Sequence, residues 1–99
     1  MYFDIPKHLS PCQQTLLAYL GGAPYRKFVF DGENVVYRDL GVHDIEISGG
    51  HTKYQPFCIY VWQKDPPRIL ERYGNLAHDH ENIKRILDDI VQRYSKEEE

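Results

Sequence analysis

The chain has 99 residues, of which 41% are hydrophobic and 27% charged, and it carries a formal net charge of −3. A chain of this length supports one domain with one modest core, and its net negative charge gives no basic footprint for nucleic acid. Its longest uninterrupted apolar run, at 57–62, is far shorter than the roughly 20 residues that cross a bilayer. We therefore expect a single α+β domain over residues 1–95 and a frayed acidic tail at 96–99, with neither a nucleic-acid nor a membrane partner.

A first helix is predicted directly after residue 10. Ser10 is a good N-cap, Pro11 suits the first helical position, and Gln13 completes a capping box with Ser10. The glycine pair at 21–22 ends the helix. Between these signals, apolar residues recur at helical spacing and indicate one buried stripe, which consists of Cys12, Leu16, Leu17, Tyr19 and Leu20.

The middle of the chain has the composition of an antiparallel sheet. Aromatic and β-branched residues at 25–30 and 35–40 flank a turn-forming cluster at 31–34, which predicts a β-hairpin. Residues 42–48 alternate apolar and polar side chains, so we expect a strand with one buried face. Residues 57–63 are apolar on both faces, which is typical of a central strand or of a strand whose outer face meets a partner. Short connections favour a four-stranded antiparallel meander.

Two further helices are predicted after the last strand. Asp65 precedes a pair of prolines and Gly74 follows them, so we predict a short helix near 66–73. Apolar residues then recur at helical spacing from about 79 to 94, and Asp79 is a suitable N-cap. We expect the N-terminal and C-terminal amphipathic helices to pack on one face of the sheet, which leaves its other face open.

The open face of the sheet is the first candidate for a site. The strand at 57–63 must expose one of two alternating sets, and the set with Tyr and Trp tolerates water and dominates binding hot spots. Acids outnumber bases five to one between Phe28 and Gly50, so this face is expected to be acidic. The alternative is that the helix near 66–73 covers the rings as a second small core. The candidate protein-binding residues are Asp31, Glu33, Tyr37, Asp44, Glu46, Tyr54, Tyr60 and Trp62.

The sequence HDHE at 78–81 is the second candidate, because histidines and acids together can bind a metal. In a helix, however, His78 and His80 diverge by about 200° around the axis, whereas helical ligand pairs are spaced by three or four residues. Asp79 and Glu81 also have structural roles, as the N-cap and as a first-turn anion that interacts favourably with the helix dipole. We therefore expect neither a metal nor a cofactor.

No nucleophile with an oriented base is evident, so we expect a protein without enzymatic activity. We predict a small interaction module that binds another protein, one with a basic surface, through the acidic, Tyr/Trp-bearing sheet face and regulates or inhibits it. Such modules are often encoded by phages or mobile elements, and the same face also permits a homodimer. The alternative is a small metal-dependent hydrolase or nuclease that uses His78 and His80, with His43 or His51 as a further ligand.

The cellular compartment is predicted from the N-terminus and the cysteines. Residues 1–10 lack the charged and apolar regions of a signal peptide. Cys12 and Cys58 each lie in an apolar pattern and do not form a metal-type pair, which favours reduced packing thiols. We therefore expect a cytoplasmic protein.

Overall fold

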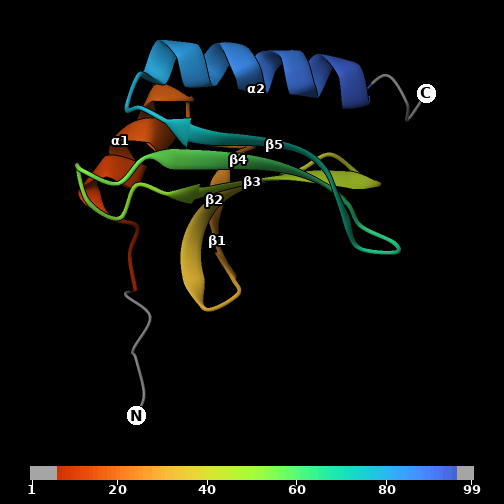
Figure 1. Cartoon of the computed structure of the whole chain (residues 1–99), viewed down its shortest axis with the longest axis horizontal. Helices are drawn as coiled ribbons and strands as arrows, with labels where there is room; N and C mark the ends of the chain where they lie inside the picture. Colours follow the sequence, from red (N-terminus) through yellow and green to blue (C-terminus); the bar gives the residue numbers. More distant parts are fainter. Residues whose placement is uncertain (1–6, 96–99) are drawn as a thin grey trace.

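The computed structural model describes residues 7–95, and the predicted tail at 96–99 lies outside the described residues. Within that range, helices α1 (Pro11–Tyr19) and α2 (His80–Ser95) precede and follow the strands. The strands are β1 (Arg26–Phe30), β2 (Glu33–Asp39), β3 (His43–Gly49), β4 (Phe57–Gln63) and β5 (Arg68–Leu76). They form one sheet in the order β1-β2-β3-β4-β5, in which every neighbouring pair is antiparallel. The molecule is thus a small α+β fold, as predicted, built on a five-stranded meander (Figure 1).

The predictions of a four-stranded sheet and of a short helix near 66–73 are wrong, because most of these residues belong to the fifth strand. β5 pairs with β4 along the full length of β4, with two shifts of register. Because of the shifts, Tyr73 and Leu76, three residues apart, both pack against the core. The signals that predict a helix here, Asp65, two prolines and Gly74, also suit a turn that is followed by a strand. Pro66 and Pro67 lie in the turn before β5.

Helix α1 begins as predicted and links two strands at one end of the sheet. The Ser10 hydroxyl accepts a hydrogen bond from the Gln13 N–H at 3.1 Å, and Gln13 Oε1 accepts one from the Ser10 N–H at 2.9 Å. Gln13 is fully buried, and its Nε2 also donates to the backbone carbonyls of Asn34 and Gly49, each at 3.0 Å. One side chain therefore caps its own helix and joins the start of β2 to the end of β3.

The loop between β3 and β4 requires glycine where it leaves β3. Gly50 has a φ of +66°, and a Cβ built on it would lie 2.1 Å from an atom of the Phe57 ring. The Ser10 hydroxyl donates to the Gly50 carbonyl at 2.6 Å, which fixes the loop to the start of α1. The loop thus packs its backbone directly against an aromatic ring, and only glycine allows that approach.

Helix α2 lies along one face of the sheet (Figure 1), and α1 packs at the end of the same core. The predicted placement of both helices on one face therefore holds for α2 and only in part for α1. Asp79 caps α2, since its Oδ1 accepts from the Asn82 N–H at 3.2 Å. Within residues 7–95, neither helix is long and apolar enough to cross a membrane. The buried core comprises Leu9, Leu16, Tyr25, Val36, Leu40, Ile45, Ile47, Phe57, Ile59, Val61, Ile83, Leu87 and Ile90.

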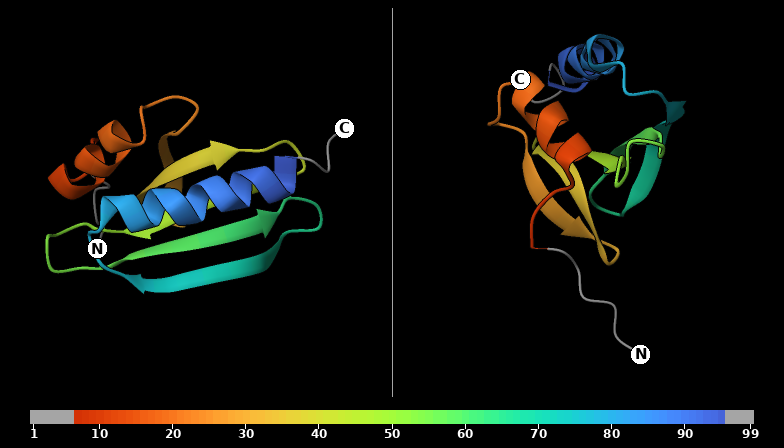
Figure 2. Two further views of the ribbon diagram at one scale, coloured as in Figure 1. Left: turned by 90° about the horizontal axis from the view of Figure 1, so that it is seen from above. Right: turned by 90° about the vertical axis from the view of Figure 1, so that its left-hand side faces the viewer.

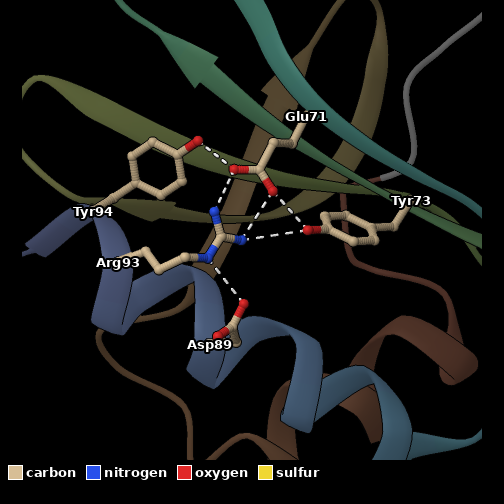
Figure 3. Close-up of polar contacts among 5 residues, drawn as sticks. All are labelled: Glu71, Tyr73, Asp89, Arg93 and Tyr94. Atoms are coloured by element: carbon tan, nitrogen blue, oxygen red, sulfur yellow. Dashed lines mark hydrogen bonds and ion pairs between the residues drawn. The ribbon is translucent and has the colours of Figure 1, made fainter.

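A network of side chains fixes the C-terminal half of α2 to the edge strand β5 (Figure 3). Arg93 donates to both oxygens of Glu71, at 2.6 and 2.9 Å, and its Nε donates to Asp89 at 2.9 Å. The hydroxyls of Tyr73 and Tyr94 donate to the same Glu71 carboxylate. The hydrogen bonds from Arg93, followed by those from the tyrosines, lower the pKa of Glu71 to about 2. The helix is therefore held on the sheet by a charged, bidentate pair.

Candidate binding face

The face of the sheet opposite α2 is the candidate site, and we refer to it as the outer face. In β4 the side chains of Phe57, Ile59 and Val61 are buried in the core beneath α2. Tyr60 and Trp62 alternate with them and are half-buried on the outer face. The period-two alternation predicted for this strand is therefore confirmed, and its aromatic set lies away from the helices.

The β1–β2 hairpin, and not a helix, covers part of the outer face. It bends out of the sheet on the side away from α2 (Figures 1 and 2). Phe30, near the tip of the hairpin, reaches Trp62 on β4, with 5.5 Å between the ring centroids. Within the hairpin Phe28 stacks on Tyr37 at 4.5 Å. The outer face is therefore concave and bordered by aromatic rings, and the alternative in which a helix near 66–73 covers the rings is wrong.

Two carboxylates of β3 lie on the concave face. Glu46 accepts a hydrogen bond from the Trp62 indole N–H at 2.9 Å, and Asp44 accepts one from the Tyr37 hydroxyl at 2.8 Å. The sequence predicts that Glu46 and Tyr37 face solvent, but they are only 7% and 8% exposed. The Trp62 indole bonds to Glu46, and Phe28 and Arg26 lie against the Tyr37 ring. The other oxygen of Asp44, Oδ1, is buried and has no hydrogen-bond partner among the described residues.

Burial raises the pKa of both carboxyls. For Glu46, burial is the main cause, and the hydrogen bond from the indole opposes it. Repulsion from Glu33, Asp44 and Asp31 raises the pKa of Glu46 further. A raised pKa means that these carboxyls reduce the stability of the folded chain progressively as the pH rises from their unfolded-state pKa values through their folded-state ones. Acidic groups whose pKa is shifted by burial in a concave face mark a candidate functional site.

The rim of the outer face carries the other predicted contact residues. Asp31 lies in the exposed turn of the β1–β2 hairpin, and Glu33 follows at the start of β2. His51, in the loop between β3 and β4, lies 3.5 Å from the Glu33 carboxylate. Tyr54 is in the same loop and is 84% exposed. The loop therefore borders the hairpin, and its exposed Tyr54 ring lies beside the sheet with the Lys53 ammonium 5.2 Å from its centroid.

Three basic side chains that sequence reasoning missed also belong to the outer face. Arg26 of β1 lies over the two stacked rings of the hairpin, 5.0 and 5.1 Å from their centroids. Arg72 of β5 lies 5.8 Å from the Tyr60 ring, and Lys64 pairs with Asp39 at 2.5 Å. Arg26 is two residues before Phe28 on the same strand, and this spacing predicts that both side chains lie on one face. Arg72 lies within the range predicted as a helix, so its place on the sheet does not follow from the sequence. The face is thus of mixed charge at its edges and acidic around Glu46.

A small hollow lies at one end of the outer face, between the hairpin and the β4–β5 turn. Its volume is about 200 Å³. That is below the roughly 300–1,000 Å³ of pockets for drug-sized ligands, so the hollow suits a single side chain better than a metabolite. Its lining residues are Phe30, Asp44, Trp62, Gln63, Lys64 and Pro67.

The histidines considered as metal ligands lie against different partners. His78 Nε2 is 2.6 Å from the Gln55 carbonyl oxygen, and the ring lies 4.7 Å from that of Phe57. The ring of His80 lies 5.5 Å from Tyr19 of α1. The ring of His43 lies 4.7 Å from Tyr94. Across residues 7–95, no group of three or more His, Cys, Asp or Glu side chains is placed to hold a metal ion.

No protein-family model matches this chain, and neither does a curated protein or a solved structure. The chemistry of the outer face follows from its own groups, which are aromatic rings, carboxylates with acidic neighbours and a hollow of side-chain size. This combination suits a ligand that is cationic and partly apolar.

Proposed function

We propose that this protein is a non-enzymatic interaction module that binds a basic segment of another protein on its outer face and thereby regulates or inhibits that protein. The observation that carries the proposal is the environment of Glu46, which is 7% exposed on a concave aromatic face with acidic neighbours that raise its pKa. A cation from a partner relieves this repulsion, and the surrounding rings supply apolar contact.

The nature of the partner follows from charge and size. A nucleic acid would bring phosphates toward Asp31, Glu33 and the β3 carboxylates, which repel them. The hollow beside Trp62 is small for a metabolite, whereas a peptide segment can lie along the concave surface and reach the exposed rim. Tyr60 and Trp62 are of the residue types that supply most of the binding energy at protein interfaces.

Capture of the partner from native lysate tests the proposal. The bait is the whole chain, and the test variant reverses two acidic charges of the hairpin rim, Asp31→Lys with Glu33→Lys. The matched control reverses two exposed acids on the solvent side of α2, Glu81→Lys with Asp88→Lys, so the net charge changes equally. We expect one protein with a basic segment, identified by mass spectrometry, to be retained by the control and lost by the rim variant.

Two results would contradict the proposal. If the rim variant retains the partner, the outer face is not the contact surface. If both variants lose it, the capture depends on net charge and not on a defined face. Dispersed amide NMR spectra of both variants establish that each is folded before the comparison is made.

A further inference from the structure

We infer that the hollow beside Trp62 is a pocket for one arginine side chain of the basic segment, an inference that rests on the proposed function. Three features carry it: a preformed aromatic wall, a carboxylate with an unused acceptor oxygen, and a volume that fits one side chain. The lining residues come from β1, β3, β4 and the β4–β5 turn, so the pocket exists only when these elements are assembled.

The aromatic wall is fixed before any ligand arrives. The Trp62 indole N–H is bonded to Glu46 at 2.9 Å, and its ring lies against Phe30 at a tilt of 48°. Pro67, from the turn before β5, adds a further apolar surface. A ligand therefore does not have to order these rings when it binds, and the entropic cost of binding is reduced.

Asp44 supplies the charge within the hollow. One of its oxygens accepts the hydrogen bond from Tyr37, which leaves Oδ1 with no partner in the described part of the chain. Lys64 also lines the hollow, but its ammonium group is already paired with Asp39 at 2.5 Å. Oδ1 is buried and unpaired in the free structure, and a cation that enters the hollow would supply the donor that it lacks.

The hollow favours arginine over lysine because it combines an aromatic ring, that of Trp62, with a carboxylate, that of Asp44. A guanidinium group is planar, weakly hydrated and forked, so it can stack on the indole while it donates to Asp44. An ammonium group is strongly hydrated and must lose more water to enter an apolar hollow. The pocket should therefore prefer arginine.

Titration with small probes tests this inference, because Trp62 is the single tryptophan of the chain and its indole N–H gives one NMR signal. The probes are N-acetyl-arginine amide, its neutral citrulline counterpart and N-acetyl-lysine amide. We expect a saturable shift of the indole signal with the arginine probe, in the millimolar range. The citrulline probe should give no saturable shift, and the lysine probe should bind more weakly than arginine.

Two variants and a control identify the pocket. Asp44→Asn should weaken the arginine probe roughly fivefold or more, because a charge-assisted bond is lost. Lys64→Gln should tighten the same probe roughly two- to threefold, because a like charge leaves the rim and Asp39 is freed. This second variant keeps the test valid if the first one fails to fold. Asp88→Asn, on α2, removes one charge far from the hollow and should leave binding unchanged.

The inference and the proposed function fail in different ways. Equal shifts with arginine and citrulline, unchanged binding by Asp44→Asn, or tighter binding of lysine would each overturn the arginine pocket. If the rim variant abolishes partner capture while Asp44→Asn does not, the proposed function stands and the pocket does not. If the arginine probe binds as expected but no partner is captured, the pocket stands and the proposed function is overturned.

Discussion

The pair between Glu71 and Arg93 predicts how the stability of the fold depends on pH. Glu71→Gln keeps the shape of the side chain and removes its charge, so it weakens the contact that fixes α2 to β5. The folded-state pKa of Glu71 is lowered from 4.5 to about 2, chiefly by the hydrogen bonds from Arg93. The stabilisation is therefore fully present above pH 4.5 and is lost as the pH falls toward 2.

The size of the effect follows from this displacement and from solvent exposure. The displacement corresponds to at most about 3 kcal/mol. Arg93 is 42% exposed, so water screens the pair, and we expect Glu71→Gln to lower the free energy of unfolding by about 1–2 kcal/mol at pH 7. For a chain of this size that loss moves the urea midpoint by about 1 M.

Urea unfolding of both proteins at pH 7 and pH 2.5, followed by circular dichroism, measures the effect. We expect the difference between wild type and variant to shrink at the lower pH, because Glu71 is then protonated in the unfolded chain while it is still mostly ionised in the folded chain, which favours unfolding. Glu81→Gln, in the exposed first turn of α2, is the matched control and should cost less than about 1 kcal/mol. A loss equal at both pH values, or no loss at pH 7, would refute the charge-based explanation.

Two further predictions concern positions that hold one end of the sheet together. Gln13→Ala removes the donor to two backbone carbonyls and should cost about 2–4 kcal/mol, whereas Gln14→Ala, at an exposed neighbour, should cost about 1 kcal/mol or less. Similar melting temperatures for these variants would contradict the linking role. Gly50→Ala combines a positive φ with a clash against Phe57 and should cost about 3 kcal/mol or more, while Gly32→Ala, at φ +80° in open space, should cost about 1–2 kcal/mol. Equal costs in urea unfolding would show that the contact with the ring does not matter.

Features that depend on neighbouring residues could be predicted from the sequence. The start of α1 follows from Ser10, Pro11 and Gln13, and the start of α2 follows from Asp79, because capping is a matter of a few consecutive residues. The alternation in β4 likewise predicts which side chains enter the core. The second role of Gln13 could not be predicted, since its acceptors lie 21 and 36 residues away along the chain.

The shape of the outer face depends on tertiary geometry, which local sequence patterns do not predict. Parity places Glu46 and Tyr37 on the side away from α2, yet contacts with Trp62, Phe28 and Arg26 decide that they are buried there. The contact between Phe30 and Trp62 joins strands that are not neighbours in the sheet. For this reason the aromatic and acidic residues of the face could be predicted, whereas its concave shape and its hollow could not.

The two edges of the sheet resist pairing with another strand in different ways. β1 is only five residues long and begins with the exposed, charged side chains of Arg26 and Lys27. β5 is longer, but its two shifts of register break the regular row of backbone groups that a further strand would need. Extension of the sheet by a second chain is therefore disfavoured at both ends, which protects the protein against edge-to-edge aggregation. Association is thereby left to side-chain chemistry instead of backbone pairing.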